Sequence, residues 1–241
     1  MKFYSKTDIG KRRTANQDAF YVGEFDNGAV MAVVCDGMGG AKGGNIASEK
    51  AATVISDYIV RSYSPKMSST TVETLLRAAV ETANSEIYEL AQTNPDYEGM
   101  GTTVVVAFVI DNLAHIVHVG DSRAYLVGAS EIEQITTDHS MVQAMVSNGE
   151  ISEQEAKVHP KKNIITRAVG AEKSVLCDYN IVLKPENAVI LICTDGLSNH
   201  LDEQSIFGTV RNTPQENCVE KLIDMANEAG GTDNITAVLI Y

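Results

Sequence analysis

Four aspartates lie beside strand-like apolar runs, at positions where the end of a strand can present a ligand. Asp36 and Asp195 each follow such a run and precede a glycine, Asp121 follows a third run, and Asp233 opens a fourth. A buried carboxylate costs several kcal/mol unless a positive group pairs with it. Because no lysine or arginine adjoins Asp36, Asp195 or Asp233, a shared divalent cation is the simplest partner. Oxygen ligands select Mg²⁺ or Mn²⁺, so the first hypothesis is a metal-dependent hydrolase.

A single aspartate after a strand is more often a turn former or a helix cap than a ligand. Asp26 and Asp111 fit that description, because each precedes asparagine. The metal interpretation therefore depends on the aspartates as a set. For Asp121 the nearby Arg123 is an alternative partner. Two roles are open for Asp138, approach to a metal or capping of the helix that follows it, and we favour the cap.

The elements that must position these side chains begin with strands. Strand-like segments are predicted at 2–8, 18–24, 28–35, 102–110, 113–120, 122–128, 175–183, 187–194 and 234–241. Segments 102–110 and 113–120 are separated by a two-residue turn, which is typical of a hairpin. Strands so close in sequence pair antiparallel, because a parallel crossover needs about a dozen residues or more.

Three helices interrupt the strands. They are predicted over 45–61, from Thr70 to about 92, and from Pro214 to about 230. Thr70 with Glu73, and Thr213 with Glu216, have the spacing of a capping box. Pro214 suits the first helical position, where no backbone N–H is needed.

Residues 138–170 differ from the rest, because they are polar, prone to form helix and placed between strands. We interpret this stretch as a helical insertion, or flap, over one edge of a sheet. Blocks of strands combined with paired helices predict the α+β class, with helices packed on antiparallel sheets. No linker or repeat divides the chain, so a single domain over 1–241 is expected.

The composition is that of an ordinary globular protein, with 44% hydrophobic and 21% charged residues among 241. A net charge of −13 argues against nucleic acid or an anionic membrane as a partner. No apolar run approaches the roughly 18 residues of a membrane span, and the first residues form no signal peptide. The four cysteines lack CxxC spacing, which favours buried free thiols in a reducing compartment. We expect a cytoplasmic monomer.

Seven motifs occur in a fixed order along the chain. They are RTANQD (13–18), DGMGG (36–40), GMGTT (99–103), VGDSRAY (119–125), DHS (138–140), TDGLS (194–198) and GTDN (231–234). Together they closely resemble the type 2C metal-dependent protein serine/threonine phosphatases (the PPM family), and the bacterial single-domain members are the nearest match. The resemblance covers essentially the whole chain.

The resemblance implies a four-layer αββα fold, in which two antiparallel sheets are flanked by helices on both faces and metals lie in a cleft at one end. By position, Asp36 would bridge two Mg²⁺ or Mn²⁺ ions and the Gly37 carbonyl would ligate one of them. Asp195 and Asp233 would complete the other ion's ligands, and Asp18 would act at the edge through water.

Two further residues have counterparts in the resemblance. Asp121, with Asp195, is similar to the ligand set of a third, weaker metal in bacterial members, and Arg13 falls where the family places its phosphate-binding arginine. Two divalent ions about 3.5–4 Å apart can activate a water between them. The hydroxide would attack phosphorus while the metals and Arg13 neutralise the phosphoryl charge.

The function implied is hydrolysis of phosphoserine and phosphothreonine on proteins, opposing serine/threonine kinases, one of which we expect among the substrates. Arg13, Asp36, Asp195 and Asp233 are the predicted catalytic residues. Two other hypotheses remain open from the residues alone. They are a phosphatase of small phosphorylated metabolites and a catalytically weakened metal-binding interaction module.

The chain departs from the family pattern at one functional position. Eukaryotic members commonly carry a histidine at the position of Met38, and bacterial members carry one at the position of Ala41. Such a histidine is a candidate general acid for the departing serine or threonine oxygen, a role typically worth about 10²–10⁴-fold in rate. We therefore expect slower turnover of alkyl phosphates than the family pattern would give, and a smaller loss for aryl phosphates.

Overall fold

The computed structural model describes the backbone of all 241 residues and the side chains outside residues 40–42, so the side chain of Ala41 lies outside the described residues. The strands are β1 (Phe3–Asp8), β2 (Asp18–Glu24), β3 (Val30–Met38), β4 (Gly101–Thr102), β5 (Val104–Ile110), β6 (Leu113–Val119), β7 (Arg123–Val127), β8 (Ile132–Gln134), β9 (Asp178–Leu183), β10 (Val189–Cys193) and β11 (Ile235–Ile240). The helices are α1 (Gly40–Ser62), α2 (Ser69–Thr93), α3 (Met141–Ser147), α4 (Glu153–Val158), α5 (Asp195–Ser198), α6 (Glu203–Asn212), α7 (Gln215–Glu228) and a short 3₁₀ turn, Pro95–Tyr97.

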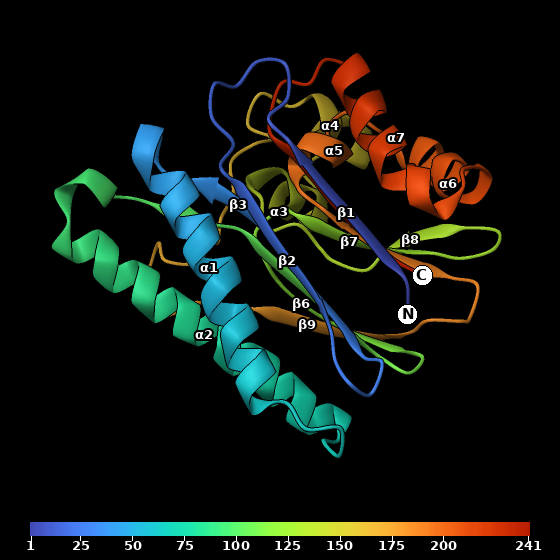
Figure 1. Cartoon of the computed structure of the whole chain (residues 1–241). Coiled ribbons are helices and arrows are strands. Elements are labelled where there is room, and N and C mark those ends of the chain that lie inside the picture. Colours follow the sequence, from blue (N-terminus) through green and yellow to red (C-terminus); the bar gives the residue numbers. More distant parts are fainter.

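The strands form two antiparallel sheets. One has the order β1-β11-β10-β7-β8, and the other has the order β2-β3-β5-β6-β9 with β4 paired to β3. Figure 1 shows α1 and α2 on the outer face of the second sheet, and α6 and α7 on the outer face of the first. The αββα fold predicted from the family resemblance is confirmed.

Alternation along β3 explains why this strand lies in the middle of the molecule. Met31, Val33 and Cys35 pack towards α1 and α2, while Val30 and Val34 pack between the two sheets. Side chains of a strand point alternately to its two faces, so a strand buried on both faces reads as a continuous apolar run. The core is therefore layered, with one apolar cluster between the sheets and one under each helical layer.

All nine predicted strands are present, with ends that differ by a few residues. Two predicted capping boxes are wrong. Ser68, not Thr70, caps α2, with its side chain accepting a hydrogen bond from Thr71 N, and α7 follows Pro214 without a side-chain cap. The four cysteines are buried and free, as predicted.

The predicted flap contains α3 and α4, and irregular backbone brings it back to the sheets. Thr102 and Val169 exchange two backbone hydrogen bonds of 3.0 and 2.9 Å, which fasten the end of the flap to the strand that follows α2. Within the described residues, no helix has the length and apolar character needed to cross a membrane.

Candidate active site

A cleft of about 790 Å³ opens where β3, β6 and β10 end and β11 begins. Its lining includes six of the residues singled out from the sequence: Arg13, Asp36, Gly37, Asp121, Asp195 and Asp233. The far wall comes from the flap, with Asn163, Ile164 and Ile165. Strand order therefore brings together carboxylates that are separated by up to about 200 positions in sequence.

The seventh residue, Asp18, is buried at the start of β2, directly opposite Asp36 in the β2·β3 register. Its Oδ2 accepts hydrogen bonds from Thr194 Oγ1 at 2.9 Å and Thr236 Oγ1 at 2.6 Å. These threonines lie beside Asp195 and on β11, so Asp18 also ties the second sheet to the first.

Thr103 holds the end of β3 in place. Its backbone N–H donates to the Asp36 carbonyl at 2.8 Å, and its hydroxyl accepts from Asp36 N at 3.0 Å. The same hydroxyl lies 2.7 Å from Ser122 Oγ, in the turn that carries Asp121. One side chain thus links the segments that bear two of the cleft carboxylates.

Gly37 is a glycine for steric reasons. A Cβ built on it would lie 2.0 Å from the Gly44 carbonyl oxygen and 2.7 Å from that of Gln17. Only a residue without a side chain permits α1 to approach β3 this closely, so the backbone of Gly37 reaches the cleft.

Asn234 organises the loop that carries Arg13. Its Nδ2 donates to the carbonyls of Ile9 and Ala15, at 2.9 and 3.0 Å, and its Oδ1 accepts from Gln17 N at 2.9 Å. The Arg13 guanidinium pairs with Asp233, with 2.7 Å between Nη2 and Oδ2. In this arrangement Arg13 is placed at the cleft and held by one of its carboxylates.

Burial and mutual repulsion raise the pKa values of the carboxyl groups in the site. Burial raises the pKa of Asp18 to about 7, against the hydrogen bonds from Thr236 and Thr194 that lower it. Burial, followed by the charge of Asp195, raises the pKa of Asp121 to about 7. Burial also raises the pKa of Asp36 well above its ordinary value, with further contributions from Asp18 and Asp195. The pKa of Asp195 is raised by burial and by Asp233.

The donor set fits hard divalent cations. Every side-chain donor is a carboxylate oxygen, which is the ligand type preferred by Mg²⁺ and Mn²⁺. Asp18 Oδ1 and Asp195 Oδ1 are buried and have no hydrogen-bond partner among the described residues. Orphaned buried oxygens beside several like charges are what a cation would satisfy.

Some residues of the site were missed by the sequence analysis. The carboxylates or the Arg13 loop are held by Thr103, Thr194, Thr236 and Asn234. Thr103, Thr194 and Asn234 lie within the motifs but were given no role, and Thr236 lies among the buried positions of β11. The prediction for Asp138 is wrong, because it accepts from Arg123 at 2.7–3.2 Å while another residue, Ser140, caps α3.

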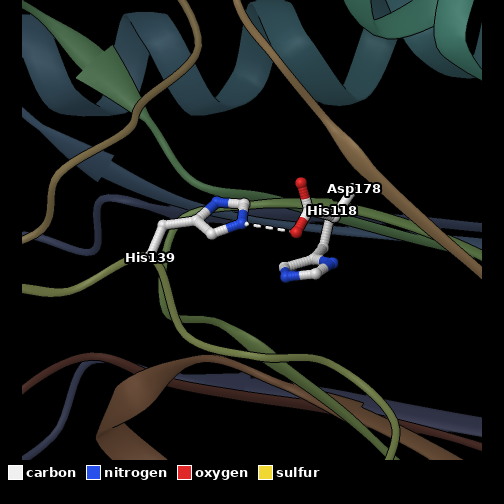
Figure 2. Close-up of side chains that lie close together, drawn as sticks. All are labelled: His118, His139 and Asp178. Carbon is white, nitrogen blue, oxygen red and sulfur yellow. Dashed lines mark ion pairs between the residues drawn. The ribbon is translucent and has the colours of Figure 1, made fainter. Parts of the chain in front are cut away.

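A second group of titratable side chains lies beside the cleft, where His118, His139 and Asp178 meet (Figure 2). Their nearest ligand atoms lie within 4.8 Å of one another. His139 Nε2 is 3.3 Å from Asp178 Oδ2, and Arg167 Nη1 is 2.8 Å from Asp178 Oδ1.

Comparisons with known proteins agree on one family. The family model described as protein phosphatase 2C matches residues 10–239. The protein phosphatase PhpP of Streptococcus pneumoniae serotype 2 is 38% identical over 237 residues, covering 97% of this chain and 94% of that protein. The structure of the serine/threonine phosphatase Stp1 from Staphylococcus aureus superposes with a TM-score of 0.93 at 33% identity, covering 99% of this chain and 93% of that one. The catalytic domain of the serine/threonine protein phosphatase PstP, solved with two manganese ions, has a TM-score of 0.86 at 30% identity, covering 99% and 96%.

Proposed function

This chain belongs to the protein phosphatase 2C family, and from that membership we infer that its cleft hydrolyses phosphoserine and phosphothreonine in proteins. Its relatives are named as protein phosphatases and serine/threonine phosphatases. Those names favour protein substrates over small phosphorylated metabolites.

One observation from the structure supports this function most directly. Asp36, Asp121, Asp195 and Asp233 come from four different segments of the chain and line one cleft. Among the described side chains, the positive charges that offset them are Arg13, which is exposed and pairs with Asp233, and Arg123, which pairs with Asp138. Such a set is costly without metal. The alternative hypothesis of a catalytically weakened interaction module is not favoured, because the chain retains every proposed metal ligand.

We assign the ligand roles as follows. Asp36 and the Gly37 carbonyl would hold two ions between them, and Asp195 and Asp233 would complete one ion's ligands. Asp18 would act at the edge through water, because it lies opposite Asp36 in the β2·β3 register and its buried Oδ1 has no hydrogen-bond partner among the described residues. When bound, two divalent ions would supply an activated water and would offset the charge of the phosphoryl group.

We propose that Asp121 binds metal and that Arg13 binds the phosphate of the substrate. Asp121, with Asp195, would hold a third and weaker ion. Two observations support this role: Asp121 lines the cleft, and the charge of Asp195 raises the pKa of Asp121. Arg13 would exchange its pairing with Asp233 for two oxygens of the incoming phosphate. A guanidinium can contact two phosphate oxygens at once, which a lysine ammonium does not do.

The identity of the metal, the oligomeric state and the cellular compartment are further proposals. A manganese-containing relative supports Mn²⁺, and the oxygen donor set suits Mg²⁺ equally. We propose a monomer acting in the cytoplasm on phosphorylated proteins, with a serine/threonine kinase among them.

The test is a comparison of two aspartate variants. Asp36→Asn keeps the size of the side chain and removes its charge, and it should lower Mn²⁺-stimulated hydrolysis of p-nitrophenyl phosphate and of a phosphothreonine peptide by about 100-fold or more. Asp111→Asn is the matched control, because Asp111 also follows a strand but lies exposed in the β5–β6 turn with a φ of 53°. Asparagine tolerates that backbone conformation.

Calorimetric titration with Mn²⁺ should show weaker binding for Asp36→Asn and no change for Asp111→Asn. Equal activity of wild type and Asp36→Asn, in folded protein, would overturn the proposed function.

A further inference from the structure

The cluster of His118, His139 and Asp178 has the composition of a transition-metal site, but its geometry is wrong for one. The two imidazole rings are stacked, with centroids 4.6 Å apart and planes at 20° (Figure 2). Ring nitrogens bind metals through lone pairs in the ring plane, so parallel stacked rings do not direct two lone pairs to one point. The Arg167 guanidinium, 3.1 Å from His139 Nε2, adds a positive charge beside the same atoms.

The hydrogen bond from Gly120 fixes the tautomer of His139. Gly120 N–H donates to His139 Nδ1 at 3.1 Å, so Nδ1 carries the lone pair and Nε2 carries the proton. Asp178 Oδ2 lies 3.3 Å from that Nε2, so the carboxylate faces the N–H side of the ring. Arg167 Nη1 can only donate, and it directs its hydrogen bond to Asp178 Oδ1 at 2.8 Å rather than to the protonated Nε2 of His139 at 3.1 Å. Burial, and then the neighbouring His118, lower the pKa of His139, which keeps the ring neutral and preserves this tautomer.

His139 holds Gly120 from both sides. Besides accepting from Gly120 N with its ring, it donates its own backbone N–H to the Gly120 carbonyl at 2.9 Å. Position 120 requires glycine, because its φ is +100° and a Cβ there would lie 2.6 Å from Thr103 Cγ2. The next residue is Asp121, which lines the cleft.

The same histidine also fixes the flap. Its carbonyl accepts from Thr166 N at 2.8 Å, and Met141 N donates to the Ile164 carbonyl at 2.8 Å. The segment between them, Ile164 and Ile165, is part of the cleft wall. The start of the flap and its returning segment, 164–166, therefore meet at His139.

We propose that His139 is a positioning residue, oriented by Asp178, that clamps Gly120 and thereby fixes the Asp121 carboxylate and the returning flap segment relative to each other. Asp178 comes from β9, the edge strand of the second sheet, so the clamp is anchored in regular structure. The inference rests on the proposed metal role of Asp121. It predicts that weakening the clamp affects the weakest metal site and leaves the Asp36 sites nearly unchanged.

Two substitutions at His139 test separately the contact of the imidazole with Gly120 and its contact with Asp178. In His139→Asn the amide oxygen lies near the position of Nδ1 and can still accept from Gly120 N. In His139→Gln the amide lies one carbon further out, so it can reach Asp178 but not Gly120. His118→Phe is the control for lost packing and a lost buried hydrogen bond. The His118 ring stacks on His139 and bonds the Thr137 carbonyl through Nε2, and among the described residues it makes no hydrogen bond to Gly120.

The first measurement needs no metal. Amide hydrogen exchange of metal-free protein, resolved by NMR, should show the Gly120 amide exchanging about five- to tenfold faster in His139→Gln than in wild type. His139→Asn should stay within about twofold. His118→Phe should change exchange broadly or not at all, without singling out Gly120. Equal exchange at Gly120 in all four proteins would overturn the clamp.

The second measurement is calorimetric titration with Mn²⁺. His139→Gln should weaken the weakest binding event about three- to tenfold and leave the tightest within about twofold, whereas His139→Asn should resemble wild type. If His139→Gln and His118→Phe weakened that event equally, the effect would be general destabilisation and the proposal would fail. Faster Gly120 exchange with unchanged Mn²⁺ affinity would overturn the link to Asp121, while leaving the phosphatase assignment to the Asp36 test.

Discussion

At position 41 an alanine stands where bacterial members of the family commonly carry a histidine. If a general acid is missing there, the turnover of substrates with poor leaving groups is reduced most, because the leaving oxygen must be protonated as it departs. We predict that Ala41→His raises kcat for a phosphoserine peptide about tenfold or more, and changes kcat for p-nitrophenyl phosphate by no more than about twofold. Both rates are measured at saturating Mn²⁺.

A matched variant removes the simpler explanation that any polar side chain at this position helps. Ala41→Gln has a comparable size and hydrogen-bonding capacity but cannot supply a proton near pH 7. It should therefore leave the ratio of the two rates as in wild type. If Ala41→His accelerated both substrates equally, the leaving-group acid would not be what the chain lacks.

The residues of the site divide into those that sequence spacing reveals and those that it hides. Asp36 and Asp195 each close an apolar run and precede a glycine, so chain pattern alone marks them. Thr103 and Asn234 are hidden, because their importance comes from contacts 67 and 225 positions away, to Asp36 and Ile9. The prediction for Asp138 fails for a related reason, because its partner Arg123 lies 15 positions earlier and the pairing of β7 with β8 separates them in sequence.

At the scale of elements, helix α2 anchors the base of the flap through one buried side chain. Asn84 Oδ1 accepts from Gly170 N at 2.7 Å, and its Nδ2 donates to the carbonyls of Glu172 and Lys173 at 3.1 and 3.2 Å. Asn84→Ala would leave Gly170 N buried without a partner and release the carbonyls of Glu172 and Lys173, at a cost of about 1–3 kcal/mol. We expect a lower free energy of unfolding in urea and faster limited proteolysis within 150–176.

The adjacent Ser85→Ala is the control for that prediction, because Ser85 is exposed on the same helix and, among the described residues, its hydroxyl bonds to the Glu81 carbonyl alone. Its unfolding and proteolysis should match wild type. Faster cleavage spread over the whole chain in Asn84→Ala would indicate global unfolding rather than release of the flap.

Long, strongly patterned elements were predictable, and short ones were not. The run that forms β3 is buried on both faces, so its apolar sequence leaves no alternative. Strand β8 has three residues and depends on pairing with β7, so its sequence alone contains too little pattern. Helix α6 was missed although Asp202, which caps it by accepting from Ser205 N, precedes apolar residues at helical spacing.

At the scale of the whole molecule, the crowded carboxylates make stability depend on pH and on metal together. The pKa of Asp18 is about 7 in the folded metal-free protein, against about 4 in an unfolded chain. Between those values the folded state binds more protons, so this group's contribution to the free energy of unfolding falls as pH rises. His118 and His139 act in the opposite direction, because burial lowers the pKa of each and their contribution is lost as pH falls below about 6.5.

Comparison of wild type with Asp18→Asn cancels the histidine contribution. Asparagine keeps an oxygen for Thr194 and Thr236 but carries no charge at any pH, so its advantage in Tm over wild type, in EDTA, should grow from pH 5 to pH 8. The expected growth is about 2 kcal/mol, or roughly 5 °C for a chain of this size. Adding Mn²⁺ at pH 8 should shrink that advantage, because the ion stabilises the ionised carboxylates of the wild type and their repulsion disappears. A difference in Tm that is constant across pH, with and without Mn²⁺, would mean that Asp18 takes no part in the charge cluster.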